Sequence, residues 1–357
     1  MDISIQDKLI RYEKWLSREP VERPMLGLLW ELDIRPLPEF IEKVGEGQRI
    51  LPEDLKPQFF LPYIEKWLQR VSQLRMDIFH SFSPGFGIPW IEAMLGCPII
   101  AGKDSIWPIP IMENKDDSAS FVIDAENPWL IVLLQLLQNM VDLSDGRFPI
   151  SLPPLHSPLD ILGMICGEKK LFLDLIENPV DIKRALKGLT EVYFQIHDFL
   201  FEYIPVFNGG YVTRLKMWAP DKAITPQNEY GSMISAEMYN NFALPIDRRI
   251  TEYYPFHSFH LHGSAFHQVE LLLTLDKLSA IQITQEHDAG GPSLENMLPV
   301  YRRVLDSKPL IIVVPDIGTA EKCMEGLPPE GLCILIMEAV YELDRSYDDW
   351  LISTCSN

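Results

Sequence analysis

The chain has 357 residues, 47% of them hydrophobic, which is enough for two ordinary domains or one large α/β barrel with a sizeable core. Its 51 acidic and 31 basic residues give a net charge of −20, which argues against nucleic acid and anionic membranes as partners. The five cysteines form no CxxC pair and fit free thiols in a reducing compartment.

The N-terminal segment "MDISIQDKLIRYEKWL" lacks the pattern of a secretory signal and predicts an amphipathic helix. No apolar run reaches the roughly 18 residues of a membrane span, and residues 128–141 predict a buried helix instead. We therefore expect a cytoplasmic protein.

Short β-rich runs alternate with longer helical patterns along the chain. The strands are expected at residues 25–32, 77–82, 147–152, 210–218, 257–263, 280–285, 309–314 and 333–340. The helices of the second half are expected at residues 179–203, 235–253, 264–275, 293–306 and 319–325. The region 84–146, outside the helix already named, reads as proline-rich loops.

This alternation predicts an α/β protein with parallel strands and right-handed crossovers. Eight strands favour a closed (β/α)8 TIM barrel, although a doubly wound open sheet would give a similar pattern. With no repeat or linker in the sequence, we expect a single domain over 1–357, in which 1–24 form an N-terminal helical extension.

The segment "FHSFHLHGSAFH" (256–267) contains four of the eight histidines. Alternation along a strand puts His260 and His262 on one face, roughly 6.5 Å apart, so that both imidazoles can reach one metal ion. Glycine follows the pair and permits a tight turn at the end of the strand. The alternative is one hydrogen-bonded core histidine and one that faces a polar cavity. His257 and His267 are interpreted as ordinary structural residues.

Two further places carry polar residues that can serve a site. In "TPQNEYGSMISAEMYNNFALP" (225–245), Asn228, Glu229 and Ser232 either bind a polar substrate or cap the helix that Ser235 starts. In "CILIMEAV" (333–340), Glu338 ends an apolar strand, where a carboxylate is either paired, bound to a metal or solvated at the rim. The GxGxxG, P-loop, HExxH and GxSxG motifs are absent.

Several segments, in this order, resemble the uroporphyrinogen decarboxylase superfamily, which includes zinc-dependent methyltransferases of corrinoid methyl-transfer systems. "REPVERPMLGLLWELDIRPLPEF" is similar to its N-terminal segment, "GSMISAEMYNNFALP" to the loop and helix before its metal strand, and "AIQITQEHDAGGPSLENMLPVYRRV" to the following strand and loop. "HLHG" stands where the methyltransferases carry His-x-Cys-Gly. The likeness covers most of residues 17–350.

The resemblance implies a (β/α)8 barrel with its active site at the carboxyl-terminal mouth. It implies a zinc ion, or another divalent metal, on His260, His262 and Glu338, with Glu338 near the position of the family's last cysteine. Glu31, Arg35, Asn228 and Glu229 would orient the substrate.

The resemblance also implies a reaction. The first-strand loop has Arg35 alone and the second strand's loop has no aspartate, which argues against porphyrinogen as the substrate. The implied activity is methyl transfer on a small methylated substrate or methyl acceptor, with the corrinoid carried by a separate protein. A metal-assisted decarboxylase or lyase for a small carboxylated substrate is the alternative, and an inactive binding protein is a third reading.

Overall fold

The computed structural model describes residues 3–30, 36–72, 74–112, 121–286, 290–338 and 346–355, with the backbone alone for Trp30, Glu338 and 346–348. No helix within these residues is both long and apolar enough to cross a membrane.

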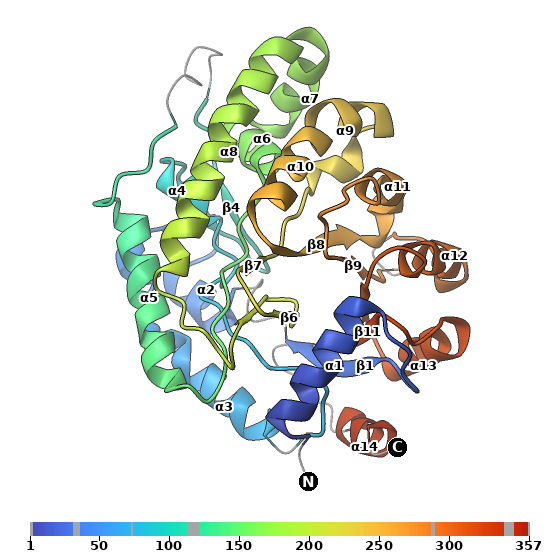
Figure 1. The fold of residues 1–357 in the computed structure, drawn as a ribbon. Helices are drawn as coiled ribbons and strands as arrows, with labels where there is room; N and C mark the ends of the chain where they lie inside the picture. The colour runs from blue at the N-terminus through green and yellow to red at the C-terminus, as the bar shows by residue number, and fades with distance from the viewer. Residues whose placement is uncertain are drawn as a thin grey trace.

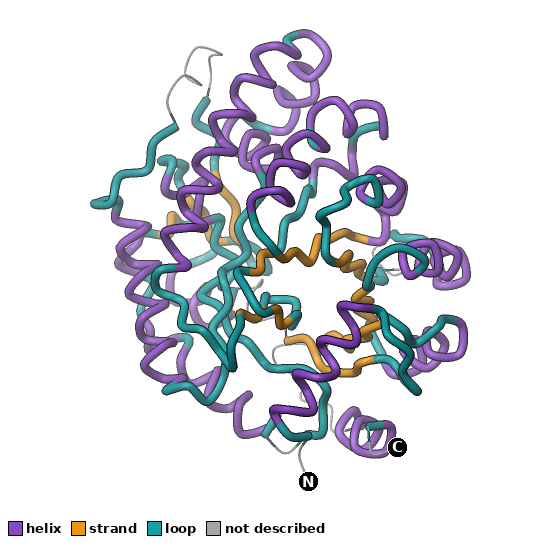
Figure 2. Tube along the Cα trace, in the orientation of Figure 1, coloured by secondary structure: helices purple, strands orange, loops and turns teal. Residues whose placement is uncertain are grey.

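A curved parallel sheet organises the molecule. It contains six strands, in the spatial order β1 (Met25–Trp30), β11 (Leu332–Glu338), β10 (Leu310–Val314), β9 (Ala280–Thr284), β8 (Phe256–His262) and β7 (Ala223–Ile224). Every neighbouring pair in this order is parallel. The strands curve around the middle of the molecule and the helices lie outside them (Figures 1 and 2). The molecule is therefore an α/β protein, as the alternating pattern predicts.

Helices account for most of the remaining chain. Those of the first half are α1 (Ile5–Ser17), α2 (Pro38–Val44), α3 (Leu61–Val71), α4 (Trp90–Met94), α5 (Pro128–Ser144), α6 (Pro158–Cys166), α7 (Glu168–Glu177) and α8 (Pro179–Phe201). Those of the second half are α9 (Ala236–Phe242), α10 (Leu244–Tyr253), α11 (Val269–Leu272), α12 (Leu294–Leu305), α13 (Ile317–Gly326) and α14 (Ser346–Thr354). The predicted helices at the N-terminus and at 128–141, 179–203, 293–306 and 319–325 are confirmed.

The helix α1 packs onto the body of the protein. The Ser4 hydroxyl caps its first turn by accepting a hydrogen bond from the Asp7 amide. Tyr12, which is 1% exposed, donates its hydroxyl to the Lys216 carbonyl oxygen at 2.5 Å and stacks on Phe79. This segment is thus part of the core as well as the start of the chain.

The polar half of the sheet's inner face comes from β8 and β9. His260 pairs in register with Gln282, and His262 with Thr284. Directly opposed residues of parallel strands project to the same side of a sheet, so these four polar side chains share one face. The stripe lies at the carboxyl end of both strands, where open and closed α/β sheets bind ligands.

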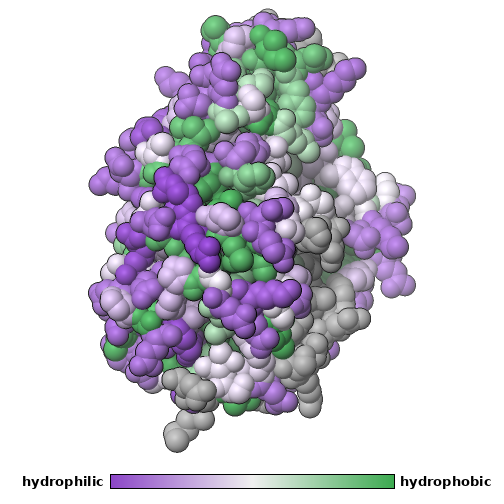
Figure 3. Space-filling view, turned by 90° about the vertical axis from the view of Figure 1, so that its right-hand side faces the viewer, coloured by the Kyte–Doolittle hydropathy of each residue, from purple (hydrophilic) through white to green (hydrophobic). Residues whose placement is uncertain are grey.

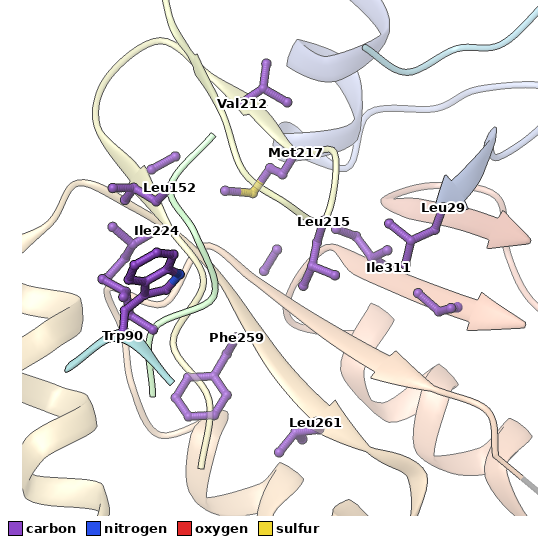
Figure 4. Packing of buried hydrophobic residues seen from close by; sticks show 14 of the residues in the cluster. Leu29, Trp90, Leu152, Val212, Leu215, Met217, Ile224, Phe259, Leu261 and Ile311 are labelled. Atoms are coloured by element: carbon purple, nitrogen blue, oxygen red, sulfur yellow. The ribbon is translucent and has the colours of Figure 1, made fainter. Parts of the chain in front are cut away.

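The apolar half of the inner face comes from β10, β11 and β1. Leu29 of β1 pairs with Met337 of β11, and Val313 of β10 pairs with Leu335 of β11. The other face packs against helices: Phe259 and Leu261 of β8 are buried in the apolar core, part of which Figure 4 shows. The surface on the right of Figure 1 is largely hydrophilic with scattered apolar side chains (Figure 3), in keeping with the net charge of −20.

The strands predicted at 77–82 and 147–152 are wrong as regular elements. They meet in a single parallel bridge between Phe82 and Ile150. The Phe82 amide donates to the Pro149 carbonyl oxygen at 3.2 Å, but Pro149 has no amide hydrogen to extend the ladder. Proline also follows at 153 and 154, which limits the pairing to one bridge.

The single strand predicted at 210–218 is also wrong. Its residues form a tight hairpin between β5 (Tyr211–Val212) and β6 (Trp218–Ala219). The Thr213 amide donates to the Met217 carbonyl oxygen at 2.8 Å, and Lys216 adopts a left-handed φ of 65°. The chain therefore doubles back where the apolar pattern suggested a continuous strand.

Proline and turn geometry explain two further differences. The helix predicted at 235–253 is interrupted at Ala243, because Pro245 lacks an amide hydrogen and starts the new helix α10. The helix predicted at 264–275 consists of a 3-10 segment, η6 (Gly263–Gln268), and the short α11.

The region 84–146 is more ordered than the proline content predicts. It contains α4, and β3 (Ile99–Ala101) and β4 (Ile106–Pro108) join β2 (Arg49–Ile50) in a small antiparallel sheet. Short 3-10 segments η2 (Pro52–Asp54), η3 (Pro57–Phe59) and η5 (Tyr230–Met233) complete the described elements.

Candidate metal centre

Two histidines lie side by side at the carboxyl end of β8. His260 and His262 leave the same face of the strand, and their ring centroids are 4.9 Å apart. A Cβ atom on Gly263 would lie 3.0 Å from the Thr284 carbonyl oxygen, so glycine permits the close approach of β9 at this point. The alternation of the strand therefore places the pair as the sequence predicts.

A neighbouring amide holds His260 in one tautomer. Gln282 donates its side-chain Nε2 to the Thr284 hydroxyl at 3.0 Å, which directs its Oε1 toward Nδ1 of His260. Nδ1 must therefore donate, and Nε2 keeps its lone pair. Burial, helped by the charge of Arg214, lowers the pKa of His260 to about 3. The ring is thus neutral at physiological pH, with Nε2 ready to bind a cation.

His262 lies between two carboxylates. Its Nε2 is 2.9 Å from Glu229 Oε2, and its Nδ1 is 2.7 Å from Glu286 Oε2. Hydrogen bonds to Glu229 and Glu286 raise the pKa of His262 to about 10, against the effect of burial. Burial alone would raise the pKa of Glu229, but the hydrogen bond to His262 and the charges of the nearby imidazoles lower it to about 2. A metal ion that binds Nε2 of His262 must displace this proton.

The loop after β7 delivers Glu229 to the two histidines. A parallel bridge joins Gln227 to His260, whose amide donates to the Pro226 carbonyl oxygen at 2.8 Å. The buried carboxylate of Asp160, at the start of α6, accepts hydrogen bonds from the amides of Glu229 and Tyr230, each at 2.9 Å. The loop is consequently fixed at both ends of the short segment that carries Glu229.

Glu229, His260 and His262 form a group that can hold a metal ion. One donor atom from each lies within 4.8 Å of the other two. Glu229 Oε1 is 3.7 Å from His260 Nε2, and Glu229 Oε2 is 2.9 Å from His262 Nε2. The Nδ1 atoms of both rings bind side-chain oxygens, of Gln282 and Glu286, which is the usual arrangement behind histidine ligands. This set of nitrogen and oxygen donors fits zinc or another divalent transition metal.

A cavity of about 340 Å³ opens in front of this group. Its polar wall includes Arg214, His156 and Glu286 in addition to the three candidate ligands. Its apolar lining includes Leu29, Ile88, Ile106, Trp107, Pro108, Met164, Leu215 and Met337. The cavity therefore suits a small molecule with an apolar body and a heteroatom directed at the metal group.

Glu31, Arg35 and Asn228 are the other residues expected to orient the substrate. Glu31 and Arg35 lie outside the described residues. Asn228 is 5% exposed and donates to Tyr239 and Asp247, so its amide supports the loop and is not among the residues that line the cavity.

The backbone of Glu338 ends β11 opposite Trp30, and its side chain lies outside the described part of the structure. Its role as a metal ligand stays a prediction. Glu229, predicted to orient substrate, lines the cavity and lies beside both histidines.

Four residues at or beside the cavity are not among those predicted for the site: Gln282, Glu286, Glu92 and His156. Gln282 and Glu286 had a readable signal, because "AIQITQEH" carries polar residues at the end of an otherwise apolar strand next to the histidine strand. Glu92 and His156 had none, since they are 64 positions apart and meet only in the folded chain.

Fold and site together define an α/β protein with a carboxylate–imidazole group at the carboxyl end of a parallel sheet. Among solved structures, the fold is similar to that of a methyltransferase from Methanosarcina mazei, with a TM-score of 0.68 over 98% of each chain. Sequence identity is 13%, so this likeness concerns the fold. No protein-family model matches the chain, and no curated protein matches it by sequence.

Proposed function

We propose that the protein is a metal-dependent methyltransferase of a corrinoid methyl-transfer system that acts on a small methylated substrate or methyl acceptor. The observation that carries the proposal is the Glu229–His260–His262 group, with both imidazoles held from behind by oxygen acceptors. The fold of the Methanosarcina mazei methyltransferase supports it. The segments that resemble the uroporphyrinogen decarboxylase superfamily support it as well.

We also infer that the sheet belongs to an irregular (β/α)8 barrel. The Asp77 amide donates to the Leu26 carbonyl oxygen of β1 at 3.0 Å, and the Phe82–Ile150 bridge continues from this segment to the next. These links occupy the place in chain order that the second and third barrel strands would take. Among the described residues, the pairing between 77–82 and 147–152 is limited to one bridge by the prolines described above.

In the proposed centre, Glu229, His260 and His262 hold a zinc or other divalent ion. Such an ion supplies Lewis acidity, which lowers the pKa of a bound thiol or polarises a methoxy or amine group. His260 binds as the neutral tautomer that Gln282 selects, and Glu286 stays on Nδ1 of His262 to orient that ring. The apolar wall around Leu29 and Met337 excludes water from the substrate's body.

The proposal assigns roles to the other predicted residues as well. Glu229 replaces Glu338 as the first choice for the carboxylate ligand, because its oxygens lie beside both histidines. Glu31 and Arg35 remain proposed substrate contacts. A separate corrinoid protein would dock at the cavity mouth, since this chain lacks a DxHxxG cobalamin signature.

The test is methyl transfer by the zinc-loaded full chain, followed through the absorbance of cobalamin. Expected results are demethylation of methylcobalamin by a small thiol, or methylation of cob(I)alamin by a methoxy or methylamine compound. H260A and H262A should both be inactive, whereas H267Q, a matched histidine change outside the cavity, should behave like the parent. Carbon dioxide release from small carboxylic acids without methyl transfer would replace the proposal with the decarboxylase alternative.

A further inference from the structure

A second carboxylate–imidazole pair faces the same cavity from another wall. His156 lines the cavity and lies in the loop before α6. Its Nδ1 is 2.9 Å from Glu92 Oε1, and its side chain is 21% exposed. Because Nδ1 is engaged by Glu92, Nε2 is the nitrogen that the ring can offer to a molecule in the cavity.

Glu92 is an unusual residue for its position. It belongs to α4, a short helix in which every residue is buried, and it is 0% exposed. Burial of a carboxylate is costly unless a cation or hydrogen bonds compensate. Oε1 contacts His156, whereas Oε2 has no hydrogen-bond partner among the described residues. The one compensating group that the described structure gives this carboxylate is thus the imidazole of His156.

The pair holds His156 in its charged form. Burial acts to lower the pKa of His156, but the charge of Glu92 and the hydrogen bond to it raise the pKa to about 9, with help from Asp160 and Glu229. At physiological pH, Nδ1 therefore donates to Glu92 and Nε2 carries a second proton. Glu229 of the metal group thus influences His156 through its charge, whereas Glu92 is the residue that contacts the imidazole directly.

We propose that His156, oriented and charged by Glu92, donates a proton to the heteroatom of the methyl donor in the cavity. Glu92 is a positioning residue for His156. The inference rests on the proposed methyl transfer and adds a catalytic residue to it.

The bond between the methyl carbon and the heteroatom of the donor breaks, and its electron pair stays on the heteroatom. A reduced Co(I) corrinoid, the co-reactant of the proposed function, supplies the electron pair of the new bond to the methyl carbon. The corrinoid thereby becomes methyl-Co(III). The heteroatom takes the Nε2 proton of His156, and the imidazole, beside buried Glu92, recovers a proton from solvent.

A phenol that binds in the cavity reports whether His156 stabilises an anionic oxygen there, and the measurement needs no methyl transfer. 4-Nitrophenol is titrated into the full chain with and without zinc, and its ionisation in the bound state is followed by absorbance. The ratio of bound phenolate to bound phenol should be about tenfold to a hundredfold higher in the parent than in H156Q, because the charged imidazole stabilises the phenolate. E92Q should lose part of this preference because its His156 is no longer held charged, and H267Q should match the parent. Two independent variants are used because both substitutions alter a buried pair, and circular dichroism monitors the fold of each.

The outcomes separate this inference from the proposed function. A parent that holds the phenolate no better than H156Q, including one that does not bind the probe, would overturn the role of His156. Zinc binding and methyl transfer by the parent report on the proposed function, whereas the effect of H156Q on that transfer reports on His156. Where transfer from 2-methoxyphenol to cob(I)alamin is measured, H156Q should lower kcat by about a hundredfold or more and leave zinc affinity unchanged. Unchanged kcat would likewise overturn the inference.

Discussion

Replacement of Glu92 by glutamine should remove a pH-dependent part of the folding stability. In the unfolded chain His156 titrates near 6.5, whereas the ion pair raises its pKa to about 9 in the folded protein. A folded-state pKa above the unfolded value stabilises the fold fully below pH 6.5, and this contribution is lost as the pH rises through 9. The difference between the two values corresponds to about 3 kcal/mol.

The assay is urea unfolding of the parent and E92Q across the pH range. The free energy of unfolding of the parent minus that of E92Q should shrink by about 3 kcal/mol between about pH 6 and about pH 10. The difference is the informative quantity, because Asp160, whose pKa burial raises to about 7, also titrates in this range in the parent. H267Q should follow the parent at every pH. A difference between parent and E92Q that does not change with pH would refute the ion pair.

Gln282→Leu should lower zinc affinity about tenfold to a hundredfold without loss of structure, because His260 loses the acceptor that orients it; competition with a chelator measures this. Gly27→Ala should destabilise the fold by about 1–3 kcal/mol, since its Cβ would lie 2.4 Å from Ile78 Cδ1, and adding Ile78→Val should recover part of the loss in urea unfolding. Burial raises the pKa of Asp247 from 3.8 to about 7, so its contribution to stability falls as the pH rises between these values. In Asp247→Asn that pH dependence should be absent, and a parent-like pH profile of unfolding would contradict the assignment.

The sequence predicts the sheet best where pairing is regular. Five strands, from β1 and from β8 to β11, occupy the segments in which apolar runs alternate with clear helices. The prediction fails at 77–82, 147–152 and 210–218, where one bridge or a hairpin replaces a strand. There the local apolar pattern competes with proline at 149 and with a turn at Lys216, and tertiary packing decides the outcome.

The site shows the same division between local and tertiary information. The shared face of His260 and His262 follows from strand alternation alone and is readable from the sequence. The place of Glu229 depends on a loop that Asp160 anchors from 69 positions away, so a residue expected to bind substrate proves to be the neighbour of both histidines. Spacing along the chain cannot reveal such a contact.

Zinc stoichiometry and affinity of the parent and E229Q decide whether Glu229, His260 and His262 bind a metal ion. Competition with a chromophoric chelator measures affinity, elemental analysis measures occupancy, and E338Q and H267Q serve as comparison proteins. We expect one zinc per parent chain, a loss of more than about a hundredfold in affinity in E229Q with native circular dichroism, and little change in H267Q, while E338Q tests whether Glu338 is a further ligand. A parent that binds no zinc, or an E229Q protein with parent-like affinity, would contradict the proposed metal centre at Glu229, His260 and His262.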